Sequence, residues 1–116
     1  MRVIEHEMLQ AVKNYEYFRK DNTRVECLDG WVRIYLHNNL IAEVLHCSGT
    51  FPSIYIDNCG WNSRTTQSRL NALLSGLDFP LRVFTKKWQH YVSMPTGSCR
   101  LDCPYGYHKE GFFNEE

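Results

Sequence analysis

Apolar residues recur at helical spacing in two parts of the chain. From about Val3 to Arg19, charged and amide residues separate the apolar positions Ile4, Met8, Ala11, Val12, Tyr15 and Phe18. From Asn62 or Ser63 to Leu77, one arc of a helical wheel holds Thr66, Leu70, Leu73, Leu74 and Leu77. Ser63 or Asn62 is a suitable N-cap, and Gly76 and Pro80 mark the end of the second pattern. Both segments are therefore predicted to form amphipathic helices.

Elsewhere the pattern shortens to that of β-strands. Residues 24–45 predict three short strands, joined by Asp29-Gly30 and by His37-Asn38-Asn39. Residues 53–57 predict a further strand, whose residues are β-branched and aromatic. Residues 80–94 predict a second hairpin with its turn at Thr85 to Lys87.

The order helix, three or four strands, helix and two strands predicts an α+β fold. Strands joined by short turns run antiparallel, and both helices must bury an apolar face. We therefore expect a two-layer sandwich in which two helices cover an antiparallel sheet of about five to six strands. Residues 1–94 are expected to form a single domain. Residues 95–116 mix Pro, Gly and aromatic residues without a period, which predicts a loop-rich C-terminal tail.

The balanced charge of the chain argues against a function that depends on a strong overall positive charge. The chain has 116 residues, of which 13 are basic and 13 acidic, so no global positive field attracts nucleic acid and any anion site must be local. The charged opening segment and the lack of a long apolar run predict a cytosolic location, in which five irregularly spaced cysteines stay reduced.

The start of the second predicted helix is rich in groups that bind anions. Arg64, Gln67 and Asn71 fall on one flank, and Arg69 projects from the other. Free N–H groups at a helix N-terminus attract phosphate, and Trp61 just before the cap is placed to stack on a base. The alternative is that Trp61 only packs as a hydrophobic staple and that the polar flank is solvated.

Five stretches of the chain resemble a group of small proteins encoded by tailed phages: IEHEML, NTRV, IYLHNNLIAEV, GWNSRTTQSRLNALL and RVFTKKWQHYV. Within that group, an aromatic residue followed ten residues later by asparagine, here Trp61 and Asn71, resembles the Thoeris anti-defence sponge proteins of the first type. Those proteins bind a cyclic ADP-ribose isomer made by bacterial TIR-domain enzymes, and some also bind cyclic oligonucleotides.

The resemblance implies a non-catalytic protein of the host cytoplasm that sequesters a cyclic nucleotide and needs no cofactor. It also implies a homo-oligomer, a dimer or a hexamer, with pockets between protomers. Only Trp61, as the stacking residue, and Asn71, as the polar reader, are carried over from the family. Arg64, Gln67, Arg33 and Arg82 are added as ligand-binding candidates from their chemistry alone.

Other interpretations remain open. Cys99, Cys103 and His108 are three candidate zinc ligands, with a fourth to come from Cys47, Cys59 or His90, although the spacing fits no common zinc finger. No nucleophile accompanies the histidines in a recognisable arrangement, so we expect no enzyme.

Residues 82–91 alternate cations and aromatic rings as proteins that bind single strands do. The alternative without a ligand is a surface hairpin from which Val83, Trp88 or Tyr91 fills the core. A host-takeover protein that binds nucleic acid or a host protein is therefore the first rival function, and a small virion component is the second.

Overall fold

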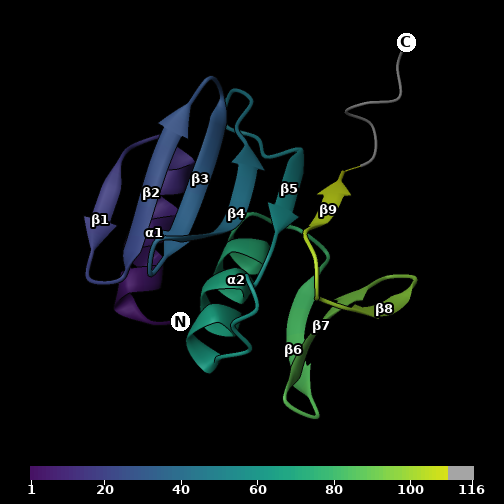
Figure 1. Cartoon of the computed structure of the whole chain (residues 1–116). Helices are drawn as coiled ribbons and strands as arrows, with labels where there is room; N and C mark the ends of the chain where they lie inside the picture. Colours follow the sequence, from purple (N-terminus) through teal and green to yellow (C-terminus); the bar gives the residue numbers. More distant parts are fainter. Residues whose placement is uncertain (110–116) are drawn as a thin grey trace.

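The computed structural model describes residues 1–109 and shows an α+β fold with two helices and two antiparallel sheets (Figure 1). The helices are α1 (Val3–Asn14) and α2 (Arg64–Gly76). The strands are β1 (Phe18–Lys20), β2 (Thr23–Leu28), β3 (Trp31–Leu36), β4 (Asn39–Leu45), β5 (Ser53–Ile56), β6 (Arg82–Lys86), β7 (Gln89–Met94), β8 (Gly97–Arg100) and β9 (Tyr105–His108). The predicted fold class is confirmed.

The strands form two sheets rather than the one that was expected. Six strands pair in the order β1-β2-β3-β4-β5-β9, and three pair in the order β6-β7-β8. Every pairing within the described residues is antiparallel. The hairpin of residues 80–94 therefore starts a small second sheet, which lies beside α2 in Figure 1.

Three of the hairpins within residues 1–109 have a two-residue turn in which both residues have positive φ. The β2–β3 turn is Asp29-Gly30, with φ of 53° and 83°, and the β3–β4 turn is His37-Asn38, with φ of 52° and 65°. The predicted Asp29-Gly30 turn is confirmed, and the second predicted turn is confirmed for His37 and Asn38, because Asn39 already begins β4. The β6–β7 turn is Lys87-Trp88, with φ of 51° and 67°, and not Thr85 to Lys87, because Thr85 pairs with His90 inside the ladder. Neither glycine nor asparagine marks this turn in the sequence.

Helix α1 is shorter than predicted. It ends at Asn14, and Tyr15 caps it in the left-handed conformation, with φ of 56°. The Tyr15 hydroxyl accepts the N–H of Gly30 at 2.8 Å, so this side chain ties the helix end to the β2–β3 turn. Phe18 begins β1 opposite Val25. The apolar spacing of Phe18 fits both the end of the helix and the start of a strand. The helix predicted from this spacing was therefore too long at its C-terminal end.

The segment after Met94 is not a loop-rich tail as far as Lys109. It contains β8 and β9, and β9 completes the large sheet by pairing Ser53 with His108 and Ile56 with Tyr105. Lys109 fixes the end of this segment, because its Nζ donates to the carbonyl of Leu77 at 3.0 Å. Four-residue strands among Gly and Pro carry too short an alternation to be found in the sequence.

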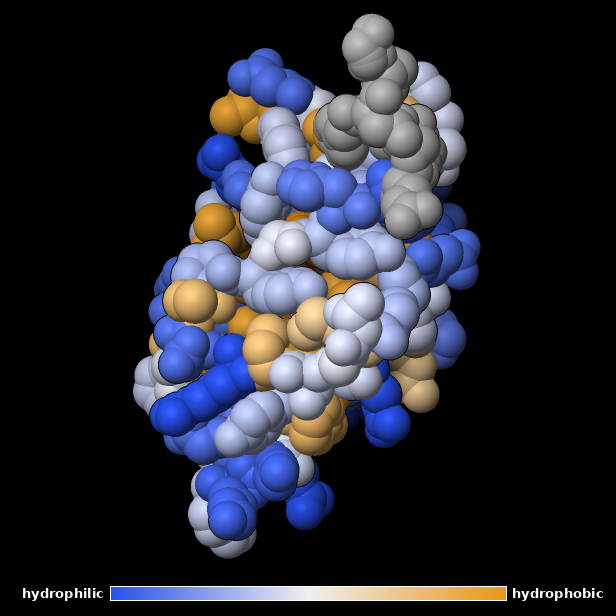
Figure 2. Space-filling model, turned by 90° about the vertical axis from the view of Figure 1, so that its right-hand side faces the viewer, coloured by the Kyte–Doolittle hydropathy of each residue, from blue (hydrophilic) through white to orange (hydrophobic). Residues whose placement is uncertain are grey.

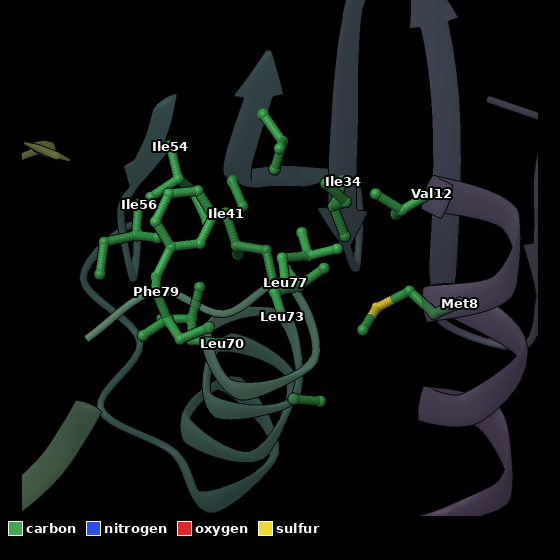
Figure 3. Close-up of a cluster of buried hydrophobic side chains, with 14 of the residues drawn as sticks. Met8, Val12, Ile34, Ile41, Ile54, Ile56, Leu70, Leu73, Leu77 and Phe79 are labelled. Atoms are coloured by element: carbon green, nitrogen blue, oxygen red, sulfur yellow. The ribbon is translucent and has the colours of Figure 1, made fainter. Parts of the chain in front are cut away.

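The core lies between the six-stranded sheet and the two helices. Figure 3 shows apolar side chains of α1 and α2 meeting those of the strands, among them Met8, Val12, Ile34, Ile41, Ile54, Ile56, Leu70, Leu73 and Leu77. All of these side chains are at most 2% exposed, so the predicted apolar arc of α2 is confirmed. Within residues 1–109, neither helix has the length and apolar content to cross a membrane.

Candidate functional site

A groove of about 730 Å³ runs along one flank of α2, between the start of α1 and the β6–β7 turn. We call it the α2 groove. Its polar and aromatic lining consists of Glu5, Asn62, Arg64, Gln67, Ser68, Asn71, Ser75, Thr85 and Trp88. The prediction that Arg64, Gln67 and Asn71 share one flank of the helix is confirmed, because all three line this groove.

The helix start at the groove is well capped. Ser63 is the N-cap, and its Oγ accepts the N–H of Thr66 at 3.1 Å, as predicted. Arg64 follows at the first helical position and is exposed. In the part of the chain that the structure describes, Arg64 has no ion pair, so its guanidinium is available to a bound anion.

Two amides on this flank hold the second sheet in place. Asn71 Nδ2 donates to the carbonyl of Val83 at 2.8 Å, and its Oδ1 accepts the N–H of the same residue at 2.7 Å. Gln67 accepts a hydrogen bond from the Thr85 hydroxyl. Strand β6 thus forms the far wall of the groove, and the Asn71 amide is engaged by the protein itself.

The aromatic residue in the α2 groove is Trp88, which the sequence did not place there. Trp88 occupies the second position of the β6–β7 turn and is 87% exposed. The one sequence signal for Trp88 is its place in the alternating cation and aromatic segment, where filling the core is the alternative role. Because the sequence pattern predicts the turn at Thr85 to Lys87, it does not place Trp88 beside α2.

The structure does not bring three of the candidates into this groove. Trp61 is 61% exposed and lines a second groove of about 480 Å³ on the other flank of α2, with His37, Ile41 and Thr65. Arg33 lies on the six-stranded sheet, where its Nε donates to Glu43 at 2.8 Å and this bond raises the pKa of Arg33. Arg82 is exposed on β6 and does not line the groove.

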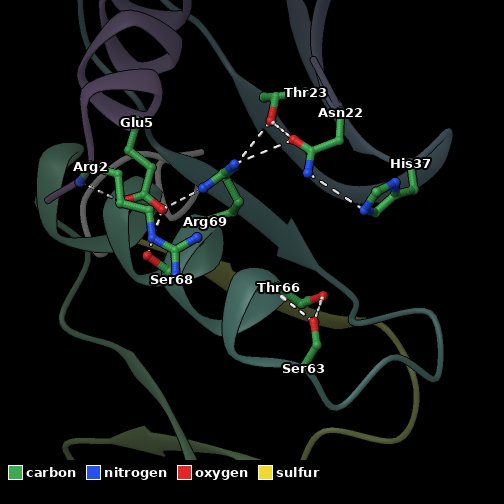
Figure 4. A network of polar contacts seen from close by, with 9 residues as sticks. All are labelled: Arg2, Glu5, Asn22, Thr23, His37, Ser63, Thr66, Ser68 and Arg69. Atoms are coloured by element: carbon green, nitrogen blue, oxygen red, sulfur yellow. Dashed lines mark hydrogen bonds and ion pairs between the residues drawn. The ribbon is translucent and has the colours of Figure 1, made fainter. Parts of the chain in front are cut away.

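Beneath the α2 groove lies a buried ion pair (Figure 4). Arg69, which was expected to project outward, is 4% exposed, and its Nη1 donates to Glu5 at 2.7 Å. Glu5 also accepts from Ser68 at 2.5 Å and from the backbone N–H of Arg2 at 3.1 Å. Burial opposes ionisation, but the hydrogen bonds from Ser68, Arg2 and Arg69 outweigh it and lower the pKa of Glu5. Arg69 is therefore a structural residue that links α2 to α1.

A buried histidine joins β7 to the start of α2. His90 is fully buried, and its backbone N–H donates to Asn62 at 2.8 Å. Asn58 Nδ2 lies 3.0 Å from His90 Nδ1, and His90 Nε2 lies 3.2 Å from the carbonyl of Ser63. These partners assign the proton to Nε2, because an amide nitrogen donates and a carbonyl accepts. Burial lowers the pKa of His90, and the bond to Ser63 only partly opposes this.

The zinc interpretation is not supported by the geometry. Among residues 1–109, no three histidine, cysteine or acidic side chains lie together as metal ligands. Cys99 is exposed on β8 in the small sheet, whereas His108 lies on β9 in the large one and bonds to Ser53 through Nδ1 at 2.7 Å. Cys99, Cys103 and His108 therefore do not form one site.

A model of the Kyanoviridae Gp96 protein family matches residues 1–115. The chain belongs to this phage protein family. Searches of curated proteins and of solved structures found no match. Membership of the Gp96 family supports the predicted phage origin. It does not confirm the resemblance to the Thoeris sponge proteins.

Proposed function

We propose that this Gp96 family protein binds and sequesters a cyclic nucleotide immune signal without transforming it. The ligand class is the one that the Thoeris sponge resemblance implies, a cyclic ADP-ribose isomer or a cyclic oligonucleotide. The observation that carries the proposal is Trp88, which is 87% exposed and left-handed at the rim of the α2 groove. The left-handed backbone strains a tryptophan, and contact of its exposed apolar ring with water is unfavourable. Residues held in such strained conformations cluster at binding sites.

The α2 groove offers the three contacts that a nucleotide needs. Trp88 provides a ring for stacking on a base, and Arg64 provides a free guanidinium for a phosphate. The Ser75 hydroxyl lines the same space and suits ribose. The hydroxyls of Ser68 and Thr85 already donate to Glu5 and Gln67, so their oxygens can only accept from ribose hydroxyls. Glu5 and Arg69 neutralise each other, so Arg64 is the unpaired charged side chain among the described lining residues, which suits a ligand with few negative charges.

Sequestration acts by mass action. A protein that holds the signal tightly lowers its free concentration below the level that an effector requires. We propose that the protein acts in the host cytoplasm as a dimer or a hexamer and that a second protomer covers the open side of the groove. This arrangement excludes water from the stacked base and raises affinity.

Calorimetry with cyclic ADP-ribose isomers and with cyclic oligonucleotides tests the proposal. We expect saturable binding of one of these ligands, at least tenfold weaker in Trp88→Ala and in Arg64→Gln, and recovery of the ligand unchanged after heating the complex. Light scattering on the same samples gives the oligomeric state.

Trp61→Ala is the matched control for Trp88→Ala, because Trp61 is also an exposed tryptophan but lines the other groove. Loss of binding in Trp61→Ala alone would place the ligand in that second groove, as the family resemblance implies for Trp61. If none of the cyclic nucleotides bound, sequestration of this ligand class would be excluded.

A further inference from the structure

The three-stranded sheet has one buried face and one outward face. Val83, His90 and Val92 are fully buried, so the face that carries them packs inward. Alternation along the strands and the cross-strand pairs place another set of side chains on the opposite face. This set, which we call the basic sheet face, consists of Arg82, Phe84, Lys86, Tyr91 and Arg100.

The charge of this region differs from that of the whole chain. Residues 79–101 contain no acidic residue but four cations, Arg82, Lys86, Lys87 and Arg100, in a chain with 13 basic and 13 acidic residues. Among the described residues, the one ion pair of these cations joins Arg100 to Asp102 at 3.9 Å, with both side chains more than half exposed. Such a pair contributes little. The sheet therefore carries a local positive field.

Two aromatic rings lie in the middle of this field. Phe84 and Tyr91 are cross-strand partners, with ring centroids 5.6 Å apart and planes inclined by 21°. Arg100 is the partner of Tyr91 on the third strand. Both rings are partly exposed, so the row across the sheet is ring, ring and guanidinium. Lys86 and Arg82 flank the row along β6, about 13 Å apart at 3.3 Å per residue.

We propose that the basic sheet face binds single-stranded nucleic acid with little dependence on sequence. Bases stack on the ring of Tyr91 or Phe84, and Arg82, Lys86 and Arg100 neutralise the neighbouring phosphates. A duplex hides its base faces in the stack and offers base edges and the sugar-phosphate backbone, so the rings favour an unpaired strand. The lower end of the molecule, where Figure 1 shows the β6–β7 turn, is hydrophilic in Figure 2.

This site is separate from the α2 groove. None of the five residues of the basic sheet face lines the groove, and the groove residues Arg64 and Trp88 are not among them. Binding of nucleic acid and binding of a cyclic nucleotide are therefore expected to be lost through different substitutions.

Fluorescence anisotropy with a labelled twelve-nucleotide oligo(dT), titrated over a range of salt concentrations, tests the proposal. For the three cations of the basic sheet face we expect a slope of about −2 in a plot of log K against log salt. Arg82→Gln/Lys86→Gln should reduce the slope by about 1.4. Tyr91→Leu should weaken binding roughly 5- to 150-fold, whereas Tyr91→Phe, which keeps the ring, should bind nearly as well as the natural protein.

Lys13→Gln/Arg19→Gln is the matched control, since it removes the same charge from exposed residues of α1 and β1. Equal loss in both double variants would assign binding to net charge and overturn the proposal. An absence of oligo(dT) binding, or equal affinity for polyglutamate or for duplex DNA, would also overturn it, because the rings would then contribute nothing. Circular dichroism of each variant shows that the fold is retained.

Discussion

The side-chain amide of Asn71 pairs with the backbone of Val83 through two hydrogen bonds, of 2.8 Å and 2.7 Å. Val83 is fully buried, so these two backbone groups have no water to replace the amide. Replacing Asn71 with leucine keeps the shape but leaves the N–H and carbonyl of Val83 unpaired. We expect Asn71→Leu to lower the free energy of unfolding by about 1–3 kcal/mol, measured by urea denaturation.

Ser75→Ala is the control for this variant, since Ser75 is exposed on the same flank of α2. Its free energy of unfolding should change by less than about 0.5 kcal/mol. Similar values for Asn71→Leu and Ser75→Ala would show that the amide does not hold β6.

Asn71 illustrates what the sequence could and could not predict. The helical period placed Asn71 correctly beside Arg64 and Gln67, because this depends only on local geometry. The partner of its amide lies 12 residues away on another element, and no local pattern specifies such a contact. For the same reason local patterns do not reveal that Trp61 and Asn71 line different grooves of one chain, or that Trp88 lies in the α2 groove.

The fold, like Asn71, was predictable where local signals determine the structure and not where contacts distant in the sequence do. Short-range signals such as Asp29-Gly30 and the Ser63 cap identified the hairpins of the large sheet and the start of α2. The pairing of β9 with β5 joins residues 49 to 55 positions apart. Its strand is too short for a periodic signal, and the segment was therefore assigned to a loop. Tertiary pairing, and not local propensity, decides the last strand of the sheet.

Removing one residue of the buried ion pair of Glu5 and Arg69 should lower the free energy of unfolding strongly, because the remaining charge is then buried without a partner. With 1% and 4% of their side chains exposed, removal of one charge leaves the other without compensation. We expect Arg69→Met to cost about 3–5 kcal/mol of the free energy of unfolding. Glu5→Gln/Arg69→Met should cost less than the sum of the two single variants, which a double-mutant cycle by urea denaturation measures. Additive costs would contradict coupling between the two side chains.

Substitutions in the Lys87-Trp88 turn should stabilise the fold but remove binding of the cyclic nucleotide. Both residues have positive φ, where asparagine and glycine are favoured. We expect Lys87→Asn/Trp88→Gly to raise the free energy of unfolding by about 1 kcal/mol and to abolish binding of the cyclic nucleotide. Asn38→Gly in the left-handed β3–β4 turn is the control, which should leave nucleotide binding unchanged. A double variant that bound the nucleotide as tightly as the natural protein would exclude Trp88 from the site.

Stability should depend on pH through His90. Burial lowers its pKa below the ordinary value of 6.5, so at mildly acidic pH the unfolded chain binds a proton that the folded chain does not. The contribution of neutral His90 is therefore complete above pH 6.5 and is lost as the pH falls from there toward the lowered pKa. The slope is at most about 1.4 kcal/mol per pH unit. In the folded state a second proton would have to enter at Nδ1, which already faces the Asn58 amide nitrogen at 3.0 Å.

Urea denaturation between pH 5 and pH 7.5 measures this slope, above the window in which protonation of Glu5, with its pKa below 4.5, contributes. His90→Gln should be less stable at neutral pH but should have a flatter profile, because glutamine does not titrate. Val92→Ala is the matched control, since Val92 is equally buried on β7 and carries no proton. It should lower the curve without changing its slope, whereas a slope unchanged in His90→Gln would assign the acid sensitivity to other groups.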